Sequence, residues 1–302
     1  MSQDLSFNLH HRLTPGVVEQ VAPNVRRLTA DNPGPHTFTG TNSYIIGEGR
    51  VAVIDPGPED QAHLATLIEA LEGETVTHIV VTHTHRDHSP LTRPLSAHTG
   101  APVLGYAGDV RPADHQGPGI EAGGDRDFAP DFTLGHGHAL EGPGWRLEAL
   151  HTPGHAANHL CFCLAGTGVL FSGDHVMGWS TTMVAPPDGD MAAYFASLAL
   201  LRARDDAVYL PGHGGEIETP SDYVRALSRH RETREASIHA ALGKVPVSAS
   251  DIALKIYEGL EPRLHRSAAL TTLAHLIHLA SKGVAEMSAP AGVDTRFWLA
   301  RS

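Results

Sequence analysis

Hydrophobic and polar positions follow a repeated pattern along the chain up to about residue 215. Short apolar, β-branched runs end abruptly in turns rich in Gly, Pro, Asp or His, which is typical of strands that stop at the edge of a sheet. The clearest runs are at residues 51–54, 78–81, 147–150, 168–171 and 207–210. Because polar residues follow each run, we expect the strand ends to present them together on a rigid scaffold.

Two stretches between these runs, at 59–72 and 191–204, have apolar residues at helical spacing. Asp188 and Asp190 precede the second stretch, and either could cap that helix. Strands interleaved with helices predict a layered α/β domain.

The pattern of hydrophobic and polar residues changes after Gly214 and Gly215, where long helical stretches begin. We expect a helix from Asp222 to about 242, a second after Ser250 to about 260, and a third from Ser267 to 282. A short extended tail at 284–300 could then close a hairpin. Three helices followed by a hairpin are the outline of a winged helix, so we place one domain at 1–219 and a second at 220–302.

The charge of the chain differs between these two parts. The 302 residues carry a net charge of −12, with 11 Lys+Arg against 8 Asp+Glu from residue 220 onward. The C-terminal part is therefore +3 and the rest −15. This balance argues against a generally basic nucleic-acid-binding protein.

The sequence pattern does not point to export or to a membrane. The first residues lack a basic-then-apolar signal pattern and no long apolar stretch is present, so we expect a cytoplasmic protein with no membrane partner. Cys161 and Cys163 share one face of an expected strand, which suits small buried core residues better than a disulfide.

Histidine is the unusual residue, with 22 in the chain. His83, His85, Asp87 and His88 fall within six residues directly after an apolar run. Imidazole and carboxylate bind zinc-like metals, and four ionisable groups so close together are hard to explain as packing. The cluster therefore predicts a metal site of the hydrolytic kind.

The pattern His-x-His-x-Asp-His after a strand resembles the signature of the metallo-β-lactamase fold superfamily. Four further motifs of that family match in order along the chain, with Asp55 in Ile-Asp-Pro-Gly, His155 in Thr-Pro-Gly-His, Asp174 in Ser-Gly-Asp-His and His213 in Pro-Gly-His-Gly. The resemblance covers about residues 20–215 and implies a four-layer αββα sandwich. Stretches 32–44, 190–201 and 229–234 resemble the lactamase-beta-2-like branch, which adds a C-terminal winged-helix-like domain.

The resemblance also implies how the ligands divide between two divalent metal ions. One ion is expected on His83, His85 and His155, and the second on Asp87, His88 and His213. Asp174 is expected to bridge them, and zinc is favoured over iron or manganese. Asp55, His159 and His175 are expected in supporting positions around the ligands.

Two adjacent cations lower the pKa of a shared water, so we expect a metal-bridging hydroxide as the nucleophile. Asp87 is the candidate to take a proton from the water and pass it to the leaving group. Trp179, Thr181, Thr182 and Met183 could line the pocket, whereas His136 and His138 lie outside every motif.

Three functions remain open at this level. The first is hydrolysis of a small ester, thioester or lactone, with the C-terminal domain as a pocket wall or a homodimer contact. The second is a single-strand endoribonuclease, which the winged-helix outline and the mildly basic C-terminal part favour. The third is a metal-sensing, DNA-binding regulator, which would not need all seven ligands.

Overall fold

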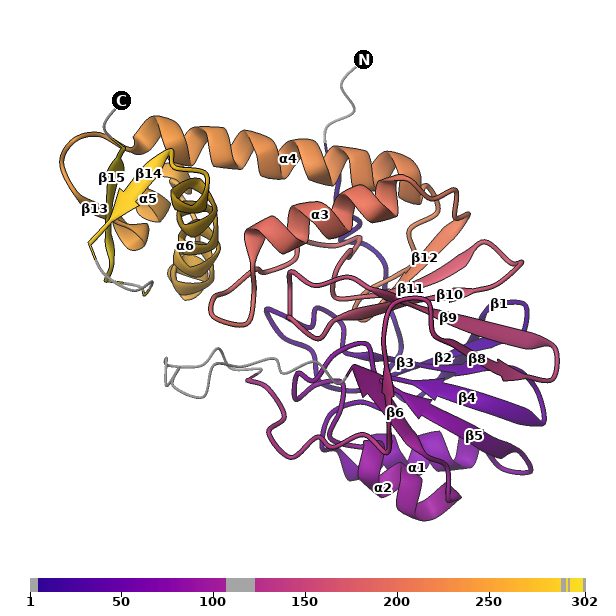
Figure 1. The fold of residues 1–302 in the computed structure, drawn as a ribbon. Helices are drawn as coiled ribbons and strands as arrows, with labels where there is room; N and C mark the ends of the chain where they lie inside the picture. Colours follow the sequence, from indigo (N-terminus) through magenta and orange to yellow (C-terminus); the bar gives the residue numbers. More distant parts are fainter. Residues whose placement is uncertain (1–4, 107–122, 289–291, 293, 301–302) are drawn as a thin grey trace.

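Two β-sheets lie face to face in the first part of the chain, with helices on both outer faces (Figure 1). The computed structural model describes residues 5–106, 123–288, 292 and 294–300. In the described residues the first sheet consists, in order, of β1 (Val18–Ala22), β2 (Val25–Thr29), β3 (Asn42–Ile46), β4 (Arg50–Ile54), β5 (Thr75–Val80), β6 (Val103–Tyr106) and β7 (Phe132–Leu134). The second consists of β12 (Val208–Pro211), β11 (Val169–Gly173), β10 (Leu160–Leu164), β9 (Trp145–His151) and β8 (Ala139–Gly142).

Strand direction explains why the polar strand ends can meet. In the first sheet β4 and β5 run parallel. In the second sheet β9 and β11 are both antiparallel to β10, and β12 is parallel to β11, so these three strands run the same way. Within each sheet, the residues that follow these strands therefore emerge at one edge.

The helices form the two outer layers of the sandwich. The chain places α1 (Gln61–Ala70) and α2 (Thr92–Thr99) on the first sheet, and α3 (Met191–Arg202) and α4 (Pro220–Ala241) on the second (Figure 1). Central strands such as β3 are buried on both faces, because Tyr44 and Ile46 pack in the core between the sheets and Ile45 packs in the core under α1 and α2. The expected four-layer αββα architecture and its five predicted strands are confirmed.

Large side chains fill the space between the two sheets. Tyr44, Phe162 and Phe171 are almost fully buried there, and the rings of Tyr44 and Phe171 meet edge to face with centroids 5.1 Å apart. The Tyr44 hydroxyl donates a 2.7 Å hydrogen bond to the carbonyl of Pro211. This bond joins β3 to the end of β12, so it ties the two sheets together beside the strand ends.

The C-terminal part has the helices and hairpin that the sequence predicts. It contains α5 (Ala249–Ile256), the 3-10 helix η1 (Pro262–Leu264), α6 (His265–Ser281) and a small antiparallel sheet of β13 (Val247–Ser248), β15 (Arg296–Leu299) and β14 (Ala285–Met287). Figure 1 shows this unit at the far end of α4.

Several predicted helix starts are wrong by a few residues. Asp190 caps α3 by accepting from the Ala193 amide at 2.7 Å, whereas Asp188 lies elsewhere. Ser248, not Ser250, caps α5, because it forms a reciprocal capping box with Asp251. Asp222 lies inside the first turn of α4, after a start at Pro220, and α6 begins before Ser267.

Helix α4 contributes to two of the hydrophobic cores of the protein. Val224 and Leu227 pack in the core outside the second sheet, while Ile238 and Leu242 pack in the core of the C-terminal unit. The domain division at 219/220 stays a prediction, and α4 physically connects the two parts.

The expectation for the two cysteines has a mixed outcome. Both cysteines are free, with Cys161 buried as predicted, but Cys163 is only half-buried and its sulfur lies 3.0 Å from Arg204 Nη2.

Among the described residues no helix is both long and apolar enough to cross a membrane.

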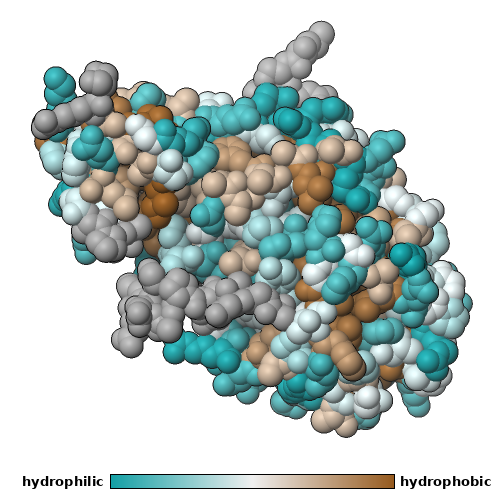
Figure 2. Space-filling model, viewed as in Figure 1, coloured by the Kyte–Doolittle hydropathy of each residue, from teal (hydrophilic) through white to brown (hydrophobic). Residues whose placement is uncertain are grey.

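Figure 2 shows apolar residues at the surface near β6, and Leu104 and Phe132 line a groove in this region.

Replacing Phe162 by Ala removes a buried ring between the two sheets. We expect the free energy of unfolding to fall by about 3–5 kcal/mol, because the lost apolar contacts leave a cavity. Urea unfolding followed by circular dichroism measures the change. Phe132→Ala is the matched control, since that ring is 61% exposed, and an equal loss in both variants would contradict this account of the core.

Candidate metal centre

The predicted ligands come together at the edge where the strands end. His83, His85, Asp87 and His88 follow β5, while His155, Asp174 and His213 follow β9, β11 and β12. The seven side chains form two groups, and within each group the ligand atoms lie within 4.8 Å of one another. The sheets therefore bring together residues that are far apart in the sequence, from His83 to His213.

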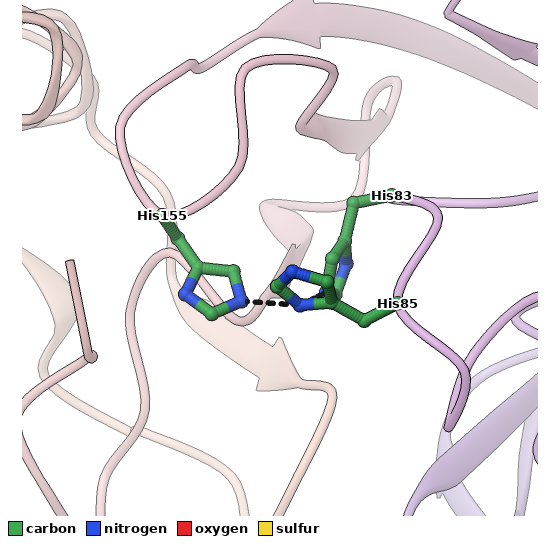
Figure 3. A group of neighbouring side chains, drawn as sticks. All are labelled: His83, His85 and His155. Atoms are coloured by element: carbon green, nitrogen blue, oxygen red, sulfur yellow. Dashed lines mark hydrogen bonds between the residues drawn. The ribbon is translucent and has the colours of Figure 1, made fainter. Parts of the chain in front are cut away.

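The first group consists of His83, His85 and His155 (Figure 3). His85 Nδ1 lies 2.9 Å from His83 Nε2 and 3.0 Å from His155 Nε2. Three nitrogens on a tetrahedral zinc ion, each bonded at about 2.0–2.1 Å, would be roughly 3.3 Å apart. The spacing of these three rings therefore fits a shared metal ion after a small expansion.

The second group consists of Asp87, His88, Asp174 and His213. His213 Nε2 lies 3.2 Å from Asp87 Oδ2, and His88 Nε2 lies 3.5 Å from Asp87 Oδ2. Each of the four side chains has a buried nitrogen or oxygen without a hydrogen-bond partner in the described part of the chain. Buried polar atoms are normally paired, so unpaired atoms on four side chains of one such group fit a site for a cation.

Asp174 lies between the two groups. Its Oδ2 is 3.3 Å from His213 Nε2 and 3.6 Å from His155 Nε2. One carboxylate is thus within reach of both positions, as expected for a bridging ligand.

Acceptors outside the cluster fix the direction of the imidazoles. Asp55 accepts hydrogen bonds from the Thr82 amide and hydroxyl, both at 2.7 Å, and from His88 Nδ1 at 2.9 Å. The same Thr82 hydroxyl accepts from His83 Nδ1 at 3.0 Å. Asp55 and Thr82 therefore leave the Nε2 atoms of both histidines aimed inward.

Backbone carbonyls hold two further rings. His155 Nδ1 donates to the Met183 carbonyl at 2.7 Å, and His213 Nδ1 donates to the Gly40 carbonyl at 3.2 Å. No sequence signal marks these partners, because any residue type supplies a carbonyl. Met183 contributes to the centre through its backbone carbonyl, whereas its expected role in lining the pocket stays a prediction.

Asp188 is a supporting residue that the sequence reasoning assigned to a helix cap. Its Oδ2 lies 3.5 Å from His85 Nε2, and its Oδ1 accepts from the Ala157 amide at 3.1 Å. Asp188 therefore faces the outer nitrogen of His85, as Asp55 faces that of His88. An N-cap lies directly before the first residue of its helix, as Asp190 does. The greater distance of Asp188 from α3 is the signal that could have distinguished the two carboxylates.

The two other predicted supporting histidines behave differently. His159 Nε2 accepts from the Asp174 amide at 3.1 Å, and its Nδ1 donates to the Thr152 hydroxyl at 2.9 Å. His175 is buried against the Tyr194 ring, and neither of its ring nitrogens has a hydrogen-bond partner in the described residues. Burial lowers the pKa of His175 to about 3, so this ring stays neutral.

Electrostatics distinguish the two groups. In the first, burial and the neighbouring imidazoles lower the pKa of His83 and bring that of His155 to about 4. In the second, burial opposes the charge of His213, but Asp174 and Asp87 outweigh it and raise the pKa to about 9. The carboxyl pKa of Asp87 is lowered by His88 and His213 against the effect of burial, so this group is ionised.

The other candidates take no part in either group. His138 accepts from the Gly135 amide at 3.2 Å and, like His136, is exposed away from the ligand clusters. Trp179 stacks on Phe38 with centroids 5.0 Å apart. Thr181 is half-buried, and Thr182 is buried and donates to the Asp174 carbonyl.

Family comparison covers most of the chain. Residues 36–213 match the model of the metallo-beta-lactamase superfamily, and residues 248–291 match that of the beta-lactamase associated winged helix domain.

Similar proteins include enzymes named for thioester cleavage. The atrochrysone carboxyl ACP thioesterase of Passalora fulva is 30% identical over 80% of this chain and 70% of its own. The lactamase-like protein adaB of Aspergillus niger is 29% identical over 74% of this chain. The chain spans about two thirds of adaB, or 66% of its length.

The fold also matches solved structures. The crystal structure of a metallo-beta-lactamase family protein from Thermus thermophilus superposes with a TM-score of 0.75 and 26% identity. The match covers 93% of this chain and all of the other, so it includes the C-terminal unit.

Replacing Asp55 by Asn tests the support of His88. Asp55 has a φ of 50°, which Asn tolerates, so the backbone should persist while the acceptor for His88 Nδ1 is weakened. We expect zinc affinity to fall by about 10–100-fold in a competition titration with a chromophoric chelator. Asp60→Asn, at the cap of α1, is the control. Equal zinc affinity in the wild type, Asp55→Asn and Asp60→Asn proteins would contradict the role of Asp55 in supporting His88.

Metal binding should release protons near neutral pH. A metal needs the neutral imidazole, and the pKa of His213 of about 9 means that this ring is protonated near neutral pH before a metal binds. Affinity should therefore weaken as the pH falls and strengthen as the pH rises toward that pKa. Calorimetric zinc titrations in two buffers of different ionisation enthalpy count the protons. His213→Ala should lower the count and the exposed His136→Ala should not, while buffer-independent heats would refute the expectation.

Proposed function

Because this chain belongs to the metallo-β-lactamase superfamily and is a hydrolase, we propose that it cleaves the thioester of a carrier-bound acyl group at a centre of two divalent metal ions. The proposed ligands are His83, His85 and His155 for one ion and Asp87, His88 and His213 for the other. Asp174 serves both, and zinc is the favoured metal, with iron and manganese as alternatives.

The position of Asp174 carries this proposal. Its Oδ2 lies within 3.6 Å of one inward nitrogen from each group, His155 Nε2 and His213 Nε2. A carboxylate placed between two sets of imidazoles supports a paired centre better than two separate structural sites, which would each be closed by four ligands of their own.

Protein groups would handle the proton during hydrolysis. Bound ions would supply Lewis acidity, which would lower the pKa of a water molecule and polarise the thioester carbonyl. Asp87 is ionised, and its buried Oδ1 has no hydrogen-bond partner in the described residues. We assign it to accept a proton from the attacking water and to deliver it to the departing thiolate, so that acid and thiol are the products.

The substrate class rests on the relatives and on charge. Relatives at 30% identity are named as acyl-carrier-protein thioesterases or thioesterases. The thioester group itself carries no charge, whereas RNA carries one negative charge per nucleotide, so the net charge near −15 of the catalytic part disfavours RNA as the substrate. Small esters and lactones share the same carbonyl chemistry and belong to the same proposal.

The nuclease and regulator hypotheses predict different behaviour. A single-strand endoribonuclease would cut RNA with the same metal ligands. A metal-sensing regulator would bind DNA with an affinity that falls steeply with salt. RNA cleavage and the salt dependence of DNA affinity can both be measured on the same protein preparation.

Zinc-loaded full-length protein should hydrolyse acyl thioesters of a phosphopantetheine-bearing carrier protein. Released thiol is followed with a disulfide reagent. His85→Ala should lose metal and turnover together, whereas Asp87→Asn should lower kcat by at least about 100-fold, because the proton carrier is removed. His136→Ala should retain full activity.

Two results would count against this function. One is metal-dependent cleavage of labelled single-stranded RNA with no turnover of any thioester, ester or lactone. The other is thioester turnover that is the same in the wild type, His85→Ala and Asp87→Asn proteins.

A further inference from the structure

Arg231, in the middle of α4, is a buried arginine that packing does not explain. It is 2% exposed and forms no ion pair with a carboxylate in the described part of the chain. Its guanidinium carbon lies 5.3 Å from the centroid of the Tyr194 ring, and its Nε has no hydrogen-bond partner there. Burying a charge without an ionic partner is unfavourable, and an apolar side chain of similar length would avoid that penalty.

The guanidinium of Arg231 donates a hydrogen bond to the loop that follows Asp174. Arg231 Nη2 donates a hydrogen bond to the carbonyl of Thr182. The Thr182 hydroxyl lies 2.7 Å from the Asp174 carbonyl and 3.0 Å from the His175 carbonyl. Tyr194, which stacks under the guanidinium, donates to the His175 carbonyl at 3.0 Å. Arg231 and Tyr194 thus hold both ends of the segment that carries the bridging carboxylate.

The same loop orients a ligand of the first group. Met183 directly follows Thr182, and its carbonyl accepts the 2.7 Å hydrogen bond from His155 Nδ1. A shift of the Thr182 carbonyl turns the peptide that joins these two residues. The Met183 carbonyl belongs to the next peptide along the chain, so a shift that also displaces Met183 would move the acceptor that keeps His155 Nε2 pointing toward His85.

One turn further along α4, Glu235 anchors the helix to the C-terminal unit. Its carboxylate accepts from His275 Nδ1 at 3.1 Å and from His278 Nδ1 at 2.7 Å, and Lys282 Nζ lies 3.3 Å away. These three partners lie on α6 or at its end. Residues 231 and 235 are on the same side of a helix, so one helical turn contacts both the loop at the metal centre and α6.

We propose that Arg231 is a positioning residue that connects the C-terminal unit to the metal centre by fixing the Thr182–Met183 peptide and, through it, His155. This inference goes beyond the proposed function, but it rests on the metal ligands assigned there. Under this proposal the metal affinity depends on a residue of α4, although α4 supplies none of the proposed metal ligands.

Cobalt titration of full-length, metal-stripped protein tests the connection. The visible absorption of Co²⁺ reports both its affinity and its coordination. Arg231→Met keeps length and packing but loses the donor to Thr182, so we expect Co²⁺ affinity to fall about tenfold and the spectrum to change. The urea midpoint should stay the same or rise, because a buried charge is removed. Arg231→Lys keeps a charged donor and should lose less affinity.

Arg225→Met is the matched control. Arg225 is on the same helix but is half exposed and pairs with Asp222 at 2.7 Å, so its removal should leave the Co²⁺ titration unchanged. Identical titrations for Arg231→Met and Arg225→Met would overturn the proposal. If Arg231→Met fails to fold, Arg231→Gln decides, because its shorter side chain cannot reach the Thr182 carbonyl, and wild-type affinity and spectrum in that variant would overturn the proposal. A wild-type protein that binds no Co²⁺ would instead refute the proposed metal centre itself.

Discussion

The structure depends on holding five imidazoles so that one nitrogen of each ring points into the candidate metal centre while the other nitrogen faces an acceptor. Bringing several titratable rings and carboxylates into one buried edge is unfavourable through desolvation and through repulsion between like groups. The protein counters this with one acceptor per ring. Asp55 faces His88, the Thr82 hydroxyl faces His83, and Asp188 lies on the outer side of His85. Carbonyls of residues 183 and 40 do the same for the remaining two rings.

These acceptors come from separate layers of the fold. Asp55 follows β4 of the first sheet, Gly40 precedes β3, and Met183 lies in the loop between β11 and α3. The centre therefore requires that the two sheets keep their mutual position. The bond from Tyr44 to the Pro211 carbonyl, beside the segment that carries His213, contributes to this alignment. Core packing between the sheets is thus a condition for the chemistry at their edge.

Local sequence patterns predicted much of this arrangement because they act over a few residues. The spacing of apolar and polar residues predicts the five strand ends, the ligand cluster after β5 and the helices α1 and α3, whereas it does not predict α2. Helix starts were less predictable, since Ser248 and Ser250 are chemically equal and only the reciprocal bond with Asp251 selects the first. Stretch 229–234, which includes Arg231, resembles the lactamase-beta-2-like branch, but the contact of Arg231 could not be predicted, because it joins positions 49 residues apart and any residue type supplies a carbonyl.

Helix α4 has a consequence for how such proteins can exchange parts during evolution. One half of it closes the core outside the second sheet and the other half closes the core of the C-terminal unit. The two regions matched by family models end before it and begin after it, at residues 213 and 248. A recombination event at either end of α4 would pair one of these two cores with an α4 that comes from the other parent. Catalytic and C-terminal units of related proteins can therefore be shuffled only as partners that share a compatible α4.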